Sequence, residues 1–138
     1  MKIDLNQYLG EWFEIARIKN DFEPNMTNVK AIYSLNDDNT IRVINSGYIN
    51  GELKQIIGKA IPTNRDDILK LSFFNNAYSN YNILAIDKNY QYSLVGGNSK
   101  NYLWILSRTK SINKNVLNKM INIAKEKGYN TDKLIITK

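Results

Sequence analysis

The chain has 138 residues, 43% of them hydrophobic and 11% aromatic, which is typical of one folded globular domain rather than of a disordered chain. It contains no cysteine and no histidine. This excludes disulfides, thiol nucleophiles, cysteine or histidine metal sites, histidine-ligated haem and histidine-based catalytic triads. The net charge of +6 favours anionic partners, although the lysines are spread along the chain as on an ordinary solvated surface.

Strand-like segments separated by short polar turns fill the chain from Leu9 to Arg108. Alternation of apolar and polar residues is clearest over 40–49. The Asn50-Gly51 pair that follows is a strong hairpin signal, because both residues accept the positive φ of a type I′ turn. The predicted strands cover 9–19, 28–35, 40–49, 52–61, 68–74, 80–86, 90–96 and 102–108.

The period of the pattern changes after Arg108. One apolar stripe then recurs at helical spacing and consists of Val116, Leu117, Met120, Ile121 and Ala124. This stripe predicts an amphipathic helix over about 112–127, with Ser111 or Asn113 as its N-cap and Gly128 just past its end. A short final strand is expected over about 134–137.

Eight sequential antiparallel strands can pack as a sandwich or close into a barrel, and connection by consecutive hairpins favours the barrel. The predicted fold is therefore all-β. It is an eight-stranded antiparallel up-and-down barrel over residues 1–138, with one C-terminal α-helix packed on its wall and a short final strand. A barrel of this size encloses packed side chains or one small ligand.

Three short motifs lie in a fixed order along these strands, and a helix follows the last of them. They are Gly10-x-Trp12 in the first strand, Asp87-x-x-Tyr90 between the sixth and seventh strands, and Arg108 at the end of Trp104-Ile105-Leu106-Ser107-Arg108. With Tyr33-Ser34-Leu35 and Ser72-Phe73-Phe74, they make the chain resemble the lipocalins, more narrowly the bacterial outer-membrane lipocalins and apolipoprotein D. The family normally has Thr where this chain has Ile86.

The resemblance implies how one end of the barrel is closed. In the family the arginine packs across the tryptophan ring and binds backbone carbonyls of the first strand. Arg108 is therefore expected to lie on Trp12, a cation–π contact of roughly 0.5–2 kcal/mol. A Gly such as Gly10 lets the chain turn tightly or pass close to other groups. Gly10, Trp12 and Arg108 are thus expected to form a structural barrel floor that binds no ligand.

Strand residues two apart share a face, so an inward Arg108 also turns Tyr102, Trp104 and Leu106 inward. The resemblance and this alternation together give the candidate ligand-binding residues: Tyr33, Val43, Asn45, Ile56, Leu71, Phe73, Tyr81, Tyr102 and Trp104. The small Gly58 and Ala60 are expected to leave volume between them. Apart from Arg108, no Arg or Lys is placed on the inward face, so selectivity is expected to come from size and shape.

The leading functional hypothesis is binding, storage or transport of a fatty acid or lysophospholipid, without cofactor, metal or catalytic residues. The first alternative is a lipocalin-fold enzyme, for which Glu14 is the inward acid, although a lone acid is more often a structural hydrogen-bond partner. The second is a nucleic-acid-binding barrel, which would need exposed aromatics interleaved with basic residues. Nucleic acid is not an expected partner, because Tyr33, Phe73 and Trp104 are predicted to point into the barrel.

An anionic membrane surface is a further candidate partner, and the chain is expected to be a monomer or a weak dimer. Bacterial relatives are exported and acylated on an N-terminal cysteine. As written, this chain shows no signal core and no such cysteine, so the expectation is a cytoplasmic location, or the periplasm or outer membrane if a leader was removed.

Overall fold

The computed structural model describes residues 2–18, 26–73 and 77–137. Its strands are β1 (Gly10–Ile18), β2 (Thr27–Leu35), β3 (Ile41–Ile49), β4 (Glu52–Pro62), β5 (Ile68–Ser72), β6 (Ser79–Ile86), β7 (Tyr92–Gly96), β8 (Leu103–Ser107) and β9 (Leu134–Ile136). Its helices are α1 (Leu5–Tyr8), α2 (Lys114–Glu126) and the 3₁₀ turn η1 (Thr131–Lys133).

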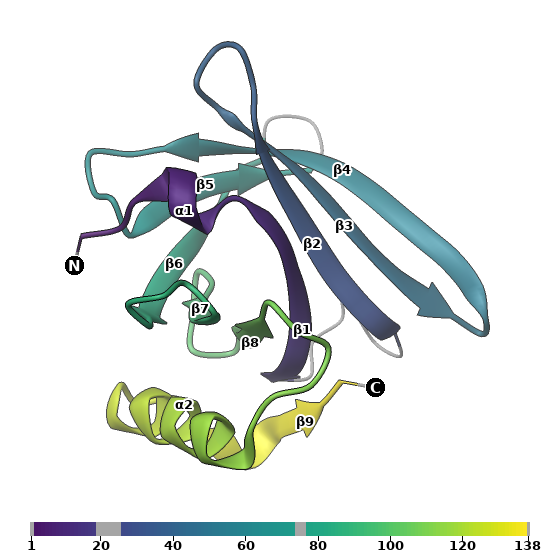
Figure 1. Ribbon diagram of the computed structural model, residues 1–138, viewed down its shortest axis with the longest axis vertical. Coiled ribbons are helices and arrows are strands. Elements are labelled where there is room, and N and C mark those ends of the chain that lie inside the picture. Colours follow the sequence, from purple (N-terminus) through teal and green to yellow (C-terminus); the bar gives the residue numbers. More distant parts are fainter. Residues whose placement is uncertain (1, 19–25, 74–76, 138) are drawn as a thin grey trace.

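The strands form one antiparallel sheet that closes on itself. Neighbours follow the order β2-β3-β4-β5-β6-β7-β8-β1-β9, and β1 also pairs with β2, so β1 to β8 make a barrel (Figure 1). β9 binds the second half of β1 from outside this ring. The predicted eight-stranded up-and-down barrel with one C-terminal helix and a short last strand is therefore confirmed.

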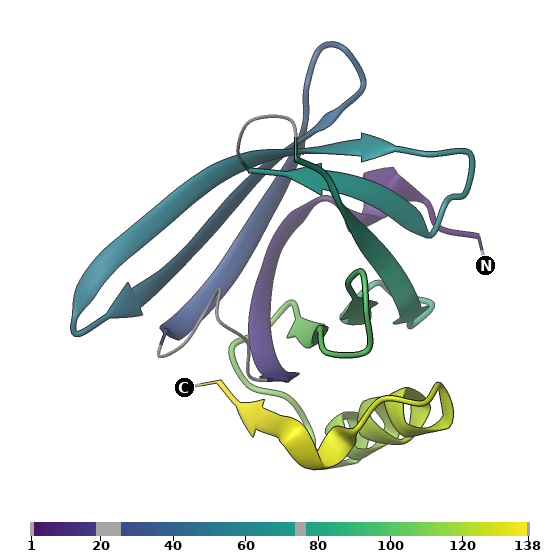
Figure 2. The same cartoon turned by 180° about the vertical axis from the view of Figure 1, so that it is seen from behind.

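The wall made by β1, β7 and β8 separates two groups of buried residues. The interior cluster consists of Ile3, Tyr8, Trp12, Ala31, Tyr33, Ile41, Val43, Ala60, Leu69, Tyr81, Ile83, Val95 and Leu106. The helix-side cluster consists of Ile15, Ala16, Ile18, Leu94, Leu103, Ile105, Met120, Ala124 and Tyr129. Figures 1 and 2 both show α2 lying against this wall, so its apolar stripe is covered by the barrel's outer surface as predicted.

The capping and turn signals act where the sequence places them. Asn113, rather than Ser111, is the N-cap of α2, its side chain accepting from the Asn115 N–H at 2.7 Å. Gly128 follows the helix with φ +93°. Asn50 and Gly51 have φ values of +53° and +78°, as a type I′ hairpin requires.

Several boundaries differ from the prediction. β7 begins at Tyr92 rather than 90, because Tyr90 lies in a turn with φ +56°. The Asp87 carboxylate accepts the Tyr92 N–H at 2.8 Å and completes that turn. β8 ends at Ser107, so Arg108 follows the strand instead of ending it. The predicted strand ends at 19 and 74 lie outside the described residues.

Candidate ligand-binding site

Arg108 closes one end of the barrel. Its guanidinium carbon lies 3.8 Å from the centroid of the Trp12 ring, which is fully buried. Its N–H groups donate to backbone carbonyls before and within β1 and in the β6–β7 turn: those of Gln7, Tyr8, Leu9, Glu11 and Tyr90, at 2.8–3.2 Å. The guanidinium thus ties the N-terminal segment to the end of the sheet.

Gly10 and the short helix α1 shape the surroundings of Arg108 and Trp12. Gly10 has φ +102°, and a β-carbon there would lie 3.3 Å from an Arg108 nitrogen, so both its conformation and its space favour glycine. The short helix α1 precedes it, and its Tyr8 carbonyl accepts the Trp12 indole N–H at 2.8 Å. A four-residue helix carries too little periodicity to be found from sequence, so α1 and the role of Tyr8 were missed.

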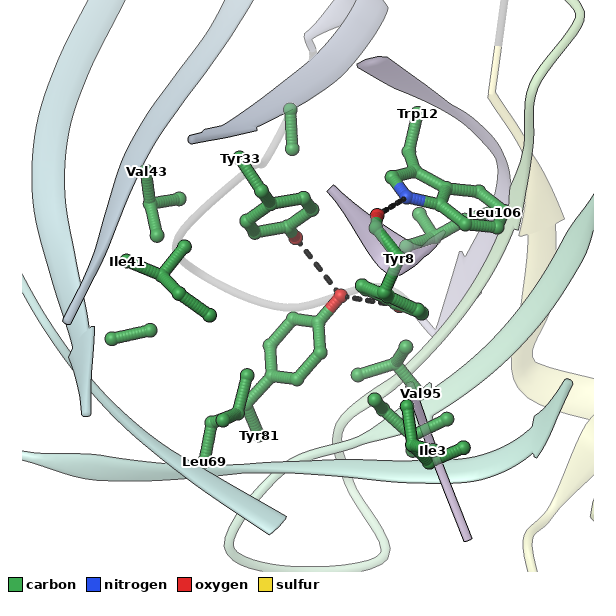
Figure 3. Packing of buried hydrophobic residues seen from close by; sticks show 13 residues of the cluster. Ile3, Tyr8, Trp12, Tyr33, Ile41, Val43, Leu69, Tyr81, Val95 and Leu106 are labelled. Atoms are coloured by element: carbon green, nitrogen blue, oxygen red, sulfur yellow. Dashed lines mark hydrogen bonds between the residues drawn. The ribbon is translucent and has the colours of Figure 1, made fainter. Parts of the chain in front are cut away.

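Above the floor, buried hydroxyls form a chain of hydrogen bonds across the barrel (Figure 3). Tyr33 donates to the Tyr81 oxygen at 2.9 Å, and Tyr81 and Tyr8 share a hydrogen bond of 2.8 Å. Tyr8 in turn bonds to the Ser93 hydroxyl at 2.8 Å. These groups come from α1, β2, β6 and β7, so the chain links both sides of the barrel.

Burial makes ionisation of these tyrosines unfavourable. It raises the pKa of Tyr8 to about 12, against the lowering effect of its hydrogen bonds to Ser93 and Tyr81. Burial, and the neighbouring Tyr33 and Tyr8, also hold the pKa of Tyr81 well above its usual value. Tyr8 and Tyr81 are therefore neutral at physiological pH. Tyr33 and Tyr81, expected as polar handles for a ligand, have hydroxyls that bind each other.

The inward faces of β2 to β6 carry most of the remaining candidates. Tyr33, Val43 and Gly58 are opposite each other across β2, β3 and β4, and Asn45 faces Ile56 in the next inward row. Val43 and Tyr81 belong to the interior cluster, whereas Leu71 and Phe73 are partly buried against it. Asn45 and Ile56 are half-buried and lie nearer to the β3–β4 turn. Tyr81 and Ile83 belong to the interior cluster, so they form the inward face of β6.

The expectation that Gly58 leaves open volume is wrong. A β-carbon at Gly58 would lie 2.5 Å from a ring carbon of Phe73, so the Phe73 ring occupies the space above this glycine. Ala60 is likewise buried within the interior cluster. The small residues of β4 thus accommodate an aromatic side chain.

Trp104 packs against the interior cluster and not under α2. It is half-buried, in contrast to the fully buried Trp12, and the Tyr102 ring stacks on it with centroids 6.2 Å apart. Because Trp104 lies four residues before Arg108, it is about 13 Å from the floor along its strand at roughly 3.3 Å per residue. The structure therefore brings together Tyr33, Val43, Leu71, Phe73, Tyr81 and Trp104 around one interior.

A family model described as a lipocalin-like domain matches residues 3–138. The chain belongs to the lipocalin family. The outer membrane lipoprotein Blc of Vibrio cholerae serotype O1 is 42% identical over 137 residues, covering 96% of this chain and 80% of that protein. Apolipoprotein D of Macaca fascicularis is 30% identical over 144 residues, covering 97% and 76%.

Among solved structures, lobster apocrustacyanin A1 superimposes with a TM-score of 0.79 at 20% identity, over 96% of this lipocalin and 77% of that chain. This likeness shows the fold. Lipocalins are binding and transport proteins for small hydrophobic ligands, which agrees with the non-enzymatic hypothesis at the level of the family.

Sequence reasoning missed one inward cation in this lipocalin. A bulge between Glu14 and Ala16 shifts the alternation of β1, so that Arg17 stands opposite Trp104 on the same face as Glu14. Arg17 is buried and donates to a Glu14 carboxylate oxygen at 2.8 Å. The expectation that Arg108 is the only inward Arg or Lys is therefore wrong.

Thr137, just after β9, completes this buried group. Its hydroxyl donates to the same Glu14 oxygen at 2.6 Å, and its N–H donates to the Ile15 carbonyl at 2.9 Å. Glu14 is thus held by Arg17 and Thr137 as a buried hydrogen-bond partner.

The part of the chain that the structure describes offers neither a cluster of metal-ligating side chains nor a membrane-spanning helix. No three His, Cys, Asp or Glu side chains come close enough together there to hold a metal ion. Over the same residues, no helix combines the length and the apolar character needed to cross a membrane.

Proposed function

We propose that this lipocalin binds a single-chain lipid, a fatty acid or a lysophospholipid, in the barrel interior and carries or stores it in the bacterial cell envelope. The observation that carries the proposal is the placement of Trp104, Phe73 and Leu71 on one inward face above a floor sealed by Arg108. An elongated apolar ligand with one polar end suits a mainly apolar interior with few polar groups.

The envelope is proposed because relatives such as the Vibrio cholerae protein are named outer membrane lipoproteins. The cytoplasmic alternative gains no support from them. The nucleic-acid alternative loses its basis, since Tyr33, Phe73 and Trp104 pack on the interior cluster instead of forming an exposed stacking surface.

Native mass spectrometry of protein purified without detergent tests the ligand class directly, because a co-purified lipid appears as added mass. The binding place is tested by tryptophan fluorescence, since Trp12 and Trp104 are the two tryptophans of the chain. Oleic acid or a lysophosphatidylcholine is expected to change the emission of Trp12→Phe and to leave that of Trp104→Phe almost unchanged. Micromolar binding reported by Trp12 alone would place the ligand elsewhere and overturn this site.

A further inference from the structure

A groove of about 480 Å³ lies where the barrel wall divides on its outer side. β1 pairs with β2 over Gly10–Phe13 and with β9 over Ala16–Ile18, while β2 continues away along β3. Figures 1 and 2 show β1 and β2 diverging from each other toward the end of β1, where β9 lies beside β1. The groove follows this division, with Thr137 and Phe13 on one side and the β2–β4 ribbon on the other.

The groove has an apolar part on the ribbon. Tyr48 and Leu53 are opposite each other on the outer face of β3 and β4, and they are 38% and 53% exposed. Ile32 on β2 lines the groove on the other side of Lys30, opposite Glu11 of β1. Large apolar side chains exposed along a groove are a common feature of binding surfaces.

The end of the groove beside β1 is cationic. Lys30 stands opposite Phe13, and the Lys110 ammonium lies 5.9 Å from the centroid of the Phe13 ring. Lys30 also pairs with Glu11 at 3.0 Å. Glu14 lines the groove too, but Arg17 neutralises its carboxylate. Two lysines therefore face one remaining acid, which leaves an excess of positive charge beside an apolar surface.

We propose that this groove is a second binding site, outside the barrel, for a single-chain amphiphile with an anionic head. The head binds at Lys30 and Lys110, and the chain lies along the ribbon from Lys30 toward Tyr48 and Leu53. The distance from β2 to β4 is about 10 Å at roughly 4.8 Å per strand spacing, which suits a chain of medium length. The volume lies within the range of small-molecule sites. This site does not depend on binding inside the barrel.

The test is a titration with dodecyl phosphate below its micelle-forming concentration, followed by native mass spectrometry and calorimetry. Two equivalents per chain are expected, of which the groove equivalent leaves the Trp104 emission unchanged. The double variant Lys30→Gln/Lys110→Gln is expected to weaken that equivalent at least tenfold and to flatten its salt dependence. Lys119→Gln, an exposed position on α2, is the matched control and should leave both equivalents unchanged.

Leu53→Asp tests the apolar part and is expected to remove the groove equivalent, while 1-dodecanol, which lacks the anionic head, should bind there at least tenfold more weakly than dodecyl phosphate. Leu53→Ser serves the same purpose if the aspartate variant melts earlier than the parent. A single equivalent that changes the Trp104 emission, or a second equivalent unaffected by these variants, overturns the proposal. So does an equal loss of both equivalents in the double-lysine variant, since the lysines would then act on the interior. Groove binding with a silent Trp104 would instead refute the interior site alone.

Discussion

The two buried clusters share the strands β1, β7 and β8 but differ in chemistry. The helix-side cluster is largely aliphatic, with Leu94, Leu103 and Ile105 fully buried against Met120 and Ala124 of α2. Apart from the Tyr129 hydroxyl, its side chains carry no hydrogen-bonding group that needs a partner. Its contribution to stability follows from the apolar area removed from water.

The interior cluster buries polar atoms along with its rings. The hydroxyls of Tyr8, Tyr33 and Tyr81 hydrogen-bond to one another, and Arg108 covers Trp12 at the floor. Each of these polar groups would be costly without its partner, so their arrangement fixes the shape of the interior. One face of the wall therefore mainly stabilises the fold, and the other mainly defines what fits inside.

The largest loss of stability is expected from the helix side. Ile105→Ala should lower the free energy of unfolding by about 2–5 kcal/mol, because it leaves a cavity in a fully buried apolar contact. Urea melts measure this loss. Ile57→Ala, at a position 53% exposed on the outer face of β4, is the control and should cost no more than about 1 kcal/mol. A small loss at Ile105 would mean that α2 is not a firm part of the barrel wall.

Arg108→Ala is expected to cost about 1–3 kcal/mol through lost packing on Trp12 and carbonyl acceptors left without donors. Ligand selectivity should not change, because Arg108 belongs to the floor. Arg42→Ala, an exposed arginine of β3, is the matched control for loss of charge. A variant as stable as the parent but unable to bind oleic acid would transfer Arg108 from the scaffold to the site.

The barrel could be predicted because its signals are local and repeated. Alternation predicted the inward faces of β3 and β8, and the positive φ tolerance of Asn50-Gly51 predicted the hairpin. Arg17 could not be predicted, since one bulge in β1 reverses the face of every later residue in the strand. Without bulges, the same rule placed Val43 and Trp104 correctly on the interior.

The hydrogen-bond chain above the floor could not be predicted from the sequence, for a different reason. Tyr33 and Tyr81 were found as inward residues, but their partner Tyr8 lies on a four-residue helix, and Ser93 on β7 carried no distinguishing pattern. Contacts between residues more than 70 positions apart depend on closure of the whole barrel.

Alkaline pH should reveal the buried tyrosines. The pKa of Tyr8 is about 12 in the folded chain and about 10 when unfolded, so between these values the unfolded chain loses the proton first. Stability from Tyr8 is therefore fully present below pH 10 and is lost as pH rises toward 12, by about 1 kcal/mol at pH 11. Urea melts at pH 9 and 11 measure how far the free energy of unfolding falls between these two pH values. The fall should be smaller in Tyr8→Phe than in the parent by about 1 kcal/mol. An equal fall in both proteins would mean that Tyr8 ionises freely when folded.

The smallest expected loss of stability concerns Thr137, which hydrogen-bonds to Glu14 beside the inward-facing Arg17. Thr137→Val keeps the shape of the side chain and removes the hydroxyl that donates to Glu14, so it should cost about 0.5–1.5 kcal/mol. The loss stays modest because Arg17 continues to neutralise the same carboxylate. Thr137→Ser retains the donor and should recover most of the stability, which separates the hydrogen bond from packing. If serine and valine cost the same, the interaction with Glu14 adds nothing. The end of β9 would then be held on β1 by its backbone hydrogen bonds, without a contribution from the Thr137 side chain.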